Sequence, residues 1–566
     1  MHVRPFLSCR SARRRAQLAV VTGMLLVTAG MGASGVGASQ TTPLAAPQIY
    51  PSVQVSTDDL PGRAWNQPQM LVDPQDPNIL VIAGANYTAA WCGIFVSRDG
   101  GRTWAQGKGV AKPAQYATCV RSDLGPFLGA AFAQDGSVVL VSAADNLGGQ
   151  QDVNDLYAAH SADLGSTWDF TIIHKGETDH KFTSADGSTE VAGEHYSLVT
   201  AAADPNSNFV YAAARVGHAS RIPPFGLFGN VPLRSVVAAS SDGGKTFGPP
   251  VDVMADVPQS QIFGAFIPEI TVGQNGLVYA ITREKTPPAD PSKPFGATSP
   301  PGGPGAGGQK FVSVSADHGK TWKTTVADDS AVHCGGCEWP PAGAADTRNS
   351  NVYIVFSQSG NTSGSPINVF FKASTDGGKT FGALVQLNDD KATVNHYYPG
   401  ISVAPNGRID VSWIDFRSSL AFDPTATPKT ETFWDIYYTY STDGGKSWAK
   451  NVRISDRSMN KNEGYTVNDN YGQMGPAGIA ATDNITYFSW SDSRRGSIQL
   501  PVEDYYFTTA VHAVTTPKTT NRAGTYAAGT ATGILAAGVV LAVGLLLVRS
   551  RRGEPSAVPS RGAVPA

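Results

Sequence analysis

Short segments in which apolar and polar residues alternate recur along most of the chain. Three of them share Pro at the first position, an apolar residue at the third and Val at the fifth: 68–72, 268–272 and 399–403. Alternation with a period of two is typical of β-strands that cover a core with one face. A turn and a second β-prone segment follow each copy. We expect these segments to be the innermost strands of a repeated β unit.

Between these segments stands a second repeat, Ser-x-Asp-x-Gly-x-(Thr/Ser)-aromatic. Its Asp can accept hydrogen bonds from backbone N–H groups, its Gly supplies a positive φ, and its aromatic residue can pack back on the sheet. The pattern therefore predicts six hairpin turns. Their aspartates are Asp99, Asp163, Asp242, Asp317, Asp376 and Asp443.

The turns follow one another at intervals of roughly 60 to 80 residues, which suits propeller blades with loop insertions and is too long for a solenoid repeat. The six turns resemble the Asp-box (BNR) repeats of sialidase-like β-propellers. That resemblance implies an all-β fold made of four-stranded blades. It also implies that the Asp boxes lie on the face opposite the active site, so their aspartates are expected to be structural.

The strand pattern predicts seven blades, one more than the six of sialidases. Looser copies of the inner-strand pattern start near Gly125, Tyr196 and Pro341, and a seventh copy at Pro476 follows the last Asp box. This seventh unit has no Asp box and lacks an outermost strand. Residues 50–58 have the alternation of such a strand, so we expect the N-terminal segment to close the ring.

The two ends of the chain predict export and anchoring. Residues 1–38 have the basic start, apolar centre and small-residue end of a signal peptide. Residues 527–548 carry no charge and precede a basic segment, so they predict one transmembrane helix. The expected order is propeller 47–512, stalk 513–526, this helix, and a cytoplasmic tail 549–566. The propeller would then lie outside the cell, at its membrane.

Composition adds two further expectations. The 566 residues have a formal net charge of −3 and 16% charged residues, which does not favour a nucleic-acid partner. Outside the cell, the cysteines favour disulfides. We expect the pairs Cys334–Cys337 and Cys92–Cys119, although Cys334 and Cys337 also fit a redox motif or part of a zinc site, and three pairings of the four residues are possible.

Two second strands end in the same pattern, Trp-x-Asp-x-Arg. It contains Asp415 and Arg417 in one blade and Asp492 and Arg494 in the next. One interpretation is an Asp–Arg pair that orients the loop; the other is an arginine that recognises a ligand carboxylate. The pattern places two more arginines, Arg215 and Arg283, at what we take to be the equivalent position.

The resemblance to sialidases also implies a chemistry. Those enzymes bind a carboxylate with three arginines, use a Tyr activated by a Glu as nucleophile and use an Asp as acid/base. The residues of these types at candidate positions are Tyr397, Glu269 and Asp415. Two functions stay open: a glycosidase that removes a terminal sugar, and a non-catalytic propeller that binds glycan or protein. No metal or cofactor is expected.

Overall fold

The structure is a computed structural model. It describes residues 44–56, 65–86, 91–116, 119, 128–145, 153–177, 180–183, 189–219, 234–257, 265–284, 309–329, 341–359, 365–391, 393–463, 477–497 and 502–513. The predicted signal peptide, transmembrane helix, cytoplasmic tail and pair Cys334–Cys337 lie outside these residues. Within them, no helix is both long and apolar enough to cross a bilayer.

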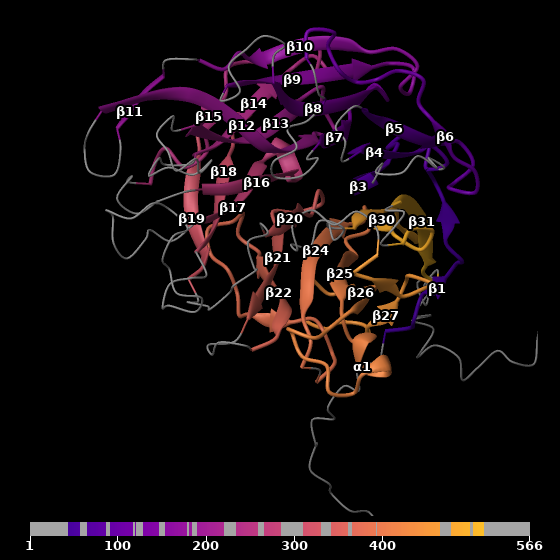
Figure 1. The fold of residues 1–566 in the computed structure, drawn as a ribbon. Helices are drawn as coiled ribbons and strands as arrows, with labels where there is room; N and C mark the ends of the chain where they lie inside the picture. The colour runs from indigo at the N-terminus through magenta and orange to yellow at the C-terminus, as the bar shows by residue number, and fades with distance from the viewer. Residues whose placement is uncertain are drawn as a thin grey trace, which may run out of the picture. The chain divides into compact units, whose positions relative to one another are not determined.

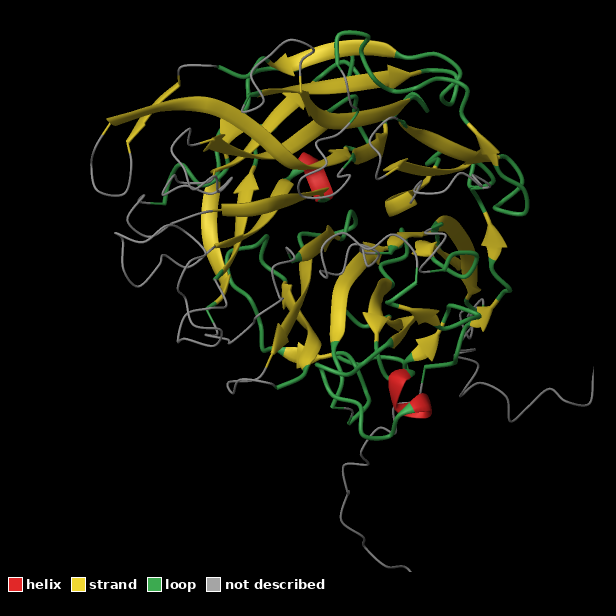
Figure 2. Ribbon diagram, in the orientation of Figure 1, coloured by secondary structure: helices red, strands yellow, loops and turns green. Residues whose placement is uncertain are grey.

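Seven antiparallel sheets surround a common axis, as predicted (Figure 1, Figure 2). Each is a blade in which consecutive strands are neighbours. The first three blades, from the axis outwards, are β3 (Trp65–Val72), β4 (Leu80–Asn86), β5 (Cys92–Ser97) and β6 (Ala105–Gln106); β7 (Gly129–Phe132), β8 (Val138–Asp145), β9 (Asn154–Ser161) and β10 (Asp169–His174); and β12 (Thr189–Ala203), β13 (Val210–Ala219), β14 (Arg234–Ser240) and β15 (Val251–Asp252), with β11 (His180–Thr183) beside β12.

The other four blades complete the ring. They are β16 (Ala265–Val272), β17 (Val278–Glu284), β18 (Lys310–Ser315) and β19 (Lys323–Asp328); β20 (Ala342–Ala345), β21 (Val352–Ser359), β22 (Ile367–Ser374) and β23 (Val385–Gln386); β24 (His396–Val403), β25 (Ile409–Asp415), β26 (Phe433–Ser441) and β27 (Val452–Arg453), with β28 (Met459–Asn460) beside β26; and β29 (Gly478–Ala481), β30 (Ile485–Asp492) and β31 (Asp504–Val511). The described helices are short: η2 (Gln274–Gly276) and α1 (Ser419–Phe422).

The N-terminal segment closes the ring, as predicted. It forms two short strands, β1 (Gln48–Ile49) and β2 (Val53–Gln54), and both pair with β31 as the outermost element of the seventh blade. Side chains add to the pairing, because the Ser56 hydroxyl donates to Asp504 at 2.8 Å. The seventh blade thus joins both ends of the propeller and leaves no open edge on β31.

The core lies between neighbouring blades. Buried apolar side chains form one cluster at each contact between blades, and the tryptophans of the Trp-x-Asp-x-Arg pattern belong to it: Trp413 packs with Tyr353 and Phe371 of the preceding blade. Cys92 and Cys119 form a disulfide, as expected, within the cluster between the first two blades.

Three innermost strands contain a residue with positive φ that is not glycine: Gln67, Leu198 and Tyr398. At each of them the register with the second strand shifts, which marks a β-bulge. A bulge bends a strand and redirects its side chains, and such strained residues are frequent at functional sites. The bulges lie toward the beginning of the inner strands, on the end of the ring away from the Asp boxes.

Candidate functional site

The Asp boxes form the predicted turns. In the first box Asp99 accepts hydrogen bonds from the backbone N–H groups of Arg102 and Thr103, both at 3.0 Å, and from the Thr103 hydroxyl at 2.7 Å. The hydrogen bond from this hydroxyl is the main cause that lowers the pKa of Asp99 to about 2. Because the carboxylate is used inside its own turn, the six Asp boxes are structural.

Strand directions define the two ends of the ring. The third strand of six blades ends in an Asp box, so these turns mark one end, the Asp-box face. Second strands end and third strands begin at the other end, which we call the loop face. It carries the ends of β8, β25 and β30, at Asp145, Asp415 and Asp492. Asp415, Asp492, Arg417 and Arg494 lie at the loop face, and Tyr397 lies near it, at the start of β24.

Asp415 and Arg417 form a closed ion pair. The Arg417 guanidinium donates to both carboxylate oxygens of Asp415, at 3.0 and 2.8 Å, and Trp413 Nε1 donates at 2.9 Å. Arg417 also pairs with Asp389, from the segment that leaves the preceding blade, at 3.1 Å. The guanidinium carbon lies 4.0 Å from the centre of the Tyr437 ring. Arg417 therefore clamps two blades together.

The next blade repeats the same arrangement. Arg494 donates to Asp492 at 2.7 Å and to Asp456, which follows β27 of the preceding blade, at 2.8 Å. Its guanidinium stacks on Tyr506 at 4.0 Å. Only 14% of the Arg494 side chain and none of the Asp492 side chain is exposed. This geometry supports the structural interpretation of both pairs, which we name the Asp–Arg clamps.

Arg215 and Arg283 are not equivalent to the clamp arginines, contrary to our expectation. Arg215 and Arg283 lie within their second strands, where their backbones pair with Ser197 and Phe266 of the inner strands. Arg417 and Arg494 instead lie two residues beyond the ends of their second strands. Arg215 is only 2% exposed, and its Nε and Nη2 donate to the Ser197 hydroxyl at 3.0 and 2.8 Å. The four arginines thus do not form one ring of equivalent side chains.

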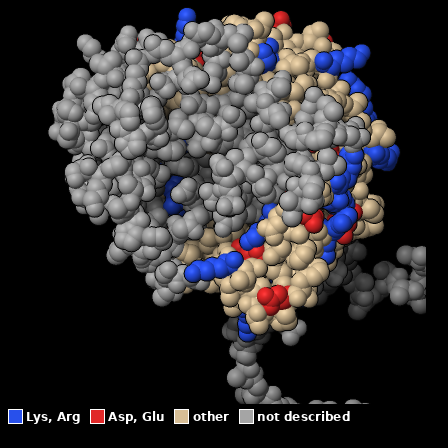
Figure 3. Space-filling model, in the orientation of Figure 1, with Lys and Arg blue, Asp and Glu red and all other residues tan. Residues whose placement is uncertain are grey.

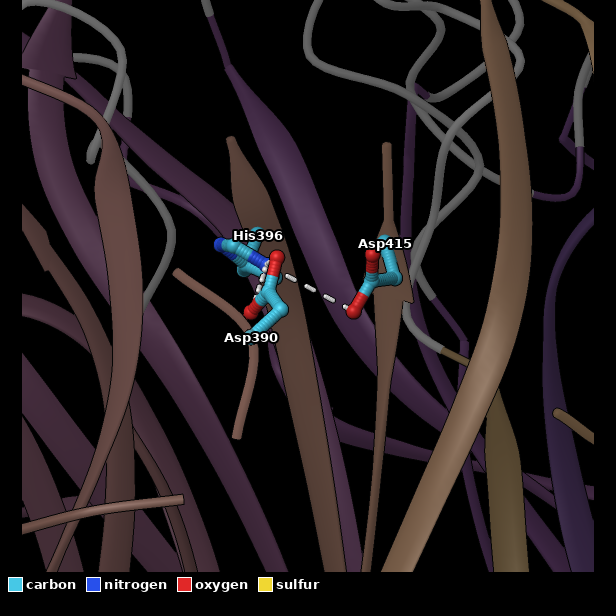
Figure 4. A group of neighbouring side chains, drawn as sticks. All are labelled: Asp390, His396 and Asp415. Atoms are coloured by element: carbon cyan, nitrogen blue, oxygen red, sulfur yellow. Dashed lines mark hydrogen bonds and ion pairs between the residues drawn. The ribbon is translucent and has the colours of Figure 1, made fainter. Parts of the chain in front are cut away.

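Behind the first clamp lies a buried histidine (Figure 4). His396, at the start of β24, directs Nε2 toward Asp390 at 3.1 Å and Asp415 at 3.5 Å. Its Nδ1 lies 2.8 Å from the carbonyl oxygen of Ile367. Burial alone would lower the pKa of His396, but the charges of Asp415 and Asp390 outweigh it and raise this pKa. The cluster favours an imidazolium that donates from both nitrogens.

Asp390, His396 and Asp415 have the residue types of a metal site, and their ligand atoms lie within 4.8 Å of one another. The hydrogen bonds argue against that use. Both oxygens of Asp415 already accept from Arg417, and the His396 proton on Nε2 supplies the positive charge between the two carboxylates. We therefore assign this cluster to the contact between blades.

Tyr397 lies in an apolar environment. It is 4% exposed, its ring centre is 5.7 Å from that of Tyr398 and 6.0 Å from that of Phe416, and it belongs to the core cluster of the last two blades. No described contact joins Tyr397 to Glu269, which stands two blades away. The structure therefore does not bring together the Tyr, Glu and Asp that the sequence suggested for catalysis.

The inner strands place one residue each at a common level around the axis. In each blade, this residue belongs to the fourth backbone pair counted from the turn between the first and second strands. The seven residues are Gln69, Gly129, Thr200, Glu269, Ala342, Gly400 and Gly478. A Cβ on Gly129 would meet the Thr200 backbone, and the Thr200 hydroxyl donates to Pro268. Each residue of this level therefore faces the next inner strand, and Glu269 faces β20.

Glu269 is the charged residue of this level. It is half-buried, and it has no hydrogen-bond or ion-pair partner among the residues that the structure describes. Burial raises the pKa of Glu269 to about 7. A carboxyl group with this pKa can donate or accept a proton near neutral pH, which suits an acid/base role or a hydrogen bond to a ligand.

Charges of both signs occur on the face drawn in Figure 3, where Asp and Glu atoms lie beside several Lys and Arg side chains of the described surface. Lys or Arg atoms are also visible inside its hollow. One positive group at the loop end of the fourth blade is Lys310, which is 4% exposed and bonds to Asp328 at 2.9 Å. Sequence reasoning missed Lys310, His396 and Asp390, because no motif contains them.

Comparisons with known proteins agree with the repeat. Residues 343–476 match the model of a BNR repeat-containing family. No curated protein matches the chain in sequence.

Solved structures that resemble the chain include a Dyadobacter fermentans protein of unknown function, with 16% identity, a TM-score of 0.39, and coverage of 68% of this chain and 94% of that one. A Hadza microbial sialidase has 12% identity, a TM-score of 0.38, and coverage of 77% and 74%. A Penicillium chrysogenum alpha-L-arabinanase complexed with arabinobiose has 14% identity, a TM-score of 0.39, and coverage of 65% and 94%.

The chain therefore folds as a seven-bladed β-propeller with six Asp-box turns, and residues 343–476 of it resemble a BNR repeat-containing family.

Proposed function

We propose that this propeller acts on glycans and that its ligand site lies at the axis of the ring on the loop face, around Glu269. The observation that carries the proposal is the state of this carboxyl group. Glu269 is half-buried without a described partner, and its pKa is raised to about 7. Maintaining such a group costs stability, and groups of this kind concentrate at functional sites.

The neighbours of Glu269 at the same level suit a ligand rich in hydroxyl groups. Gln69 offers an amide and Thr200 a hydroxyl, which donates to the Pro268 carbonyl, while Gly129, Gly400 and Gly478 let neighbouring inner strands approach one another closely. A protonated Glu269 can donate to a sugar hydroxyl, and an ionised one can accept from it. The resemblance to sialidase-like propellers points to the same class of ligand.

Binding without hydrolysis agrees better with the described residues than a sialidase mechanism does. Arg417 and Arg494 are paired with aspartates, Asp415 accepts hydrogen bonds on both oxygens, and Tyr397 lies in the core. Their assignment as substrate-binding or catalytic residues remains a prediction. Hydrolysis with Glu269 as the acid/base is the second candidate function, because its pKa lies where general acid catalysis is efficient.

The test combines a glycan array with a panel of chromogenic α- and β-glycosides, both with the purified chain. We expect binding to a defined group of glycans. Release of chromophore that is lost in Glu269→Gln would assign catalysis to this residue. If the chain bound no glycan and released no chromophore, a glycan-directed function would be contradicted. The matched control is Asp329→Asn, which changes an exposed carboxylate of the same blade.

A further inference from the structure

Both ends of the propeller leave it on the Asp-box face. The last strand, β31, begins at the loop face with Asp504 and ends at the other face, where the N–H of His512 donates to the carbonyl of Asn484, in the turn between β29 and β30, at 2.8 Å. At the other end of the chain, Ala45 accepts a hydrogen bond from the Tyr440 hydroxyl, next to the Asp box that starts at Ser441.

The C-terminal exit is held firmly. His512 Nε2 lies 3.0 Å from the hydroxyl of Thr486, and Thr486 donates to the buried carboxylate of Asp410 at 2.8 Å. Arg408 completes this network, with Nε donating to Asp410 at 2.9 Å. Because these groups are buried and bonded to one another, they hold His512 at the Asp-box face, where the described part of the chain ends.

The segment that follows is short. Residues 514–526 separate the propeller from the uncharged stretch 527–548. Thirteen residues span at most roughly 45 Å when extended and on the order of 20 Å as a flexible chain. The blades themselves are of similar depth, since the eight residues of β31 extend over about 27 Å.

From this geometry we infer that the propeller stands on the membrane with its Asp-box face inward and presents its loop face to glycans that approach from outside. The inference rests on the proposed glycan site and on the predicted C-terminal helix. The partner is therefore a glycan in solution or on another surface, in trans. A sugar attached to a lipid of the same membrane would meet the Asp-box face instead.

Two lysines of one blade provide a matched test. Lys446 lies in the Asp box of the sixth blade and Lys429 in the loop between β25 and β26 on its loop face; both are exposed. Two variants of the full chain, Lys446→Cys and Lys429→Cys, are each inserted into lipid vesicles. The introduced cysteine is labelled with a donor dye. The unsubstituted chain gives the background from its own cysteines. Energy transfer to an acceptor dye on the lipid head groups should be at least twofold more efficient from the Lys446→Cys variant.

Equal transfer from the two positions, or stronger transfer from Lys429→Cys, would overturn the inference. Failure of the chain to float with the vesicles would also overturn it, because the helix would then not anchor the propeller. In a second arm the vesicles are mixed with beads that carry a glycan bound on the array, and capture is expected. If no glycan binds in any assay, the proposed function fails while the orientation remains testable by energy transfer alone.

Discussion

At the scale of single residues, Glu269 combines a half-buried position on an inner strand with a raised pKa. Other carboxylates on the loop face that the structure describes, such as Asp415, Asp492 and Asp435, are buried against arginines. Glu269 has no such partner among the described residues, so burial alone determines its pKa. This difference separates a candidate for ligand contact from the residues that hold the blades together.

The raised pKa of Glu269 predicts a stability that depends on pH. In the unfolded chain the carboxyl ionises near pH 4.5, and in the folded protein near pH 7, so the folded state binds more protons between these values. Stability should therefore fall as pH rises from 4.5 through 7, by roughly 1 to 3 kcal/mol. Urea unfolding at pH 5 and pH 8 measures this effect.

The substitution Glu269→Gln should remove this part of the pH dependence, while Asp329→Asn should leave it in place. If Glu269→Gln and the wild-type chain lose the same stability between pH 5 and pH 8, then Glu269 is not ionising with a raised pKa.

The clamp arginines lead to a second prediction. Replacing Arg417 with Ala leaves the fully buried Asp415 carboxylate without its guanidinium partner and with only His396, at 3.5 Å, as a charged neighbour. Breaking a buried pair from one side costs about 3 kcal/mol or more, whereas an exposed pair contributes about 0 to 1 kcal/mol. Lys323→Ala removes such an exposed pair, with Asp256, and is the control. Denaturant unfolding should show the larger loss for Arg417→Ala.

A different result would support a role of Arg417 in ligand binding. If Arg417→Ala unfolded like the wild-type chain but lost binding to an acidic glycan, the guanidinium would be recognising a carboxylate, as the second interpretation of the sequence pattern holds.

At the scale of elements, the sequence predicted the blades well. The Asp-box octapeptide is a local motif whose hydrogen bonds stay within one turn, and the inner-strand pattern reflects burial on one face, so both are readable without tertiary information. The same is not true of Arg215 and Arg283. Each is the sixth residue of its second strand, and no local pattern marks where these second strands begin and end.

The Asp boxes predict sensitivity to acid. Burial opposes ionisation of Asp242, but hydrogen bonds from Thr246 and Ser240 outweigh it and lower its pKa to about 2. A lowered pKa contributes stability above the unfolded value near 3.8, and this contribution is lost as pH falls toward 2. Asp242→Asn should therefore cost about 1 kcal/mol at pH 6 and progressively less below pH 4.

Thermal unfolding of the two proteins between pH 6 and pH 2.5 measures the difference. A constant gap between wild type and Asp242→Asn over this range would show that the carboxylate charge does not stabilise the turn. Asp329→Asn again serves as the control, since Asp329 is exposed and belongs to no Asp box.

At the scale of the whole molecule, ring closure by the N-terminal segment joins the two ends of the propeller in one blade. Deletion of residues 47–57 removes β1, β2 and the bond from Ser56 to Asp504, and it exposes the edge of β31. We expect a lower melting temperature and a lower soluble yield. A synthetic peptide of residues 44–57 should restore part of the loss. An unchanged melting temperature would contradict closure by this segment.

The number of blades was predictable because the seventh unit repeats the inner-strand pattern even without an Asp box. The candidate site was predictable only in part. Glu269 stands in the inner-strand pattern itself, but its half-buried position and its lack of a described partner depend on tertiary packing that no local pattern marks. His396 meets Asp390, six residues earlier in the connection between the fifth and sixth blades, but this pair belongs to no recognisable motif.

The central claim is that the ligand site is at the axis of the loop face and involves Glu269. Isothermal titration of the purified chain with the tightest glycan from the array tests it most directly, with wild type, Glu269→Gln and Asp329→Asn compared at pH 6. Loss of a hydrogen bond to a carboxyl group predicts a Kd about tenfold higher or more for Glu269→Gln and an unchanged Kd for Asp329→Asn. Equal Kd values for all three proteins would place the site elsewhere.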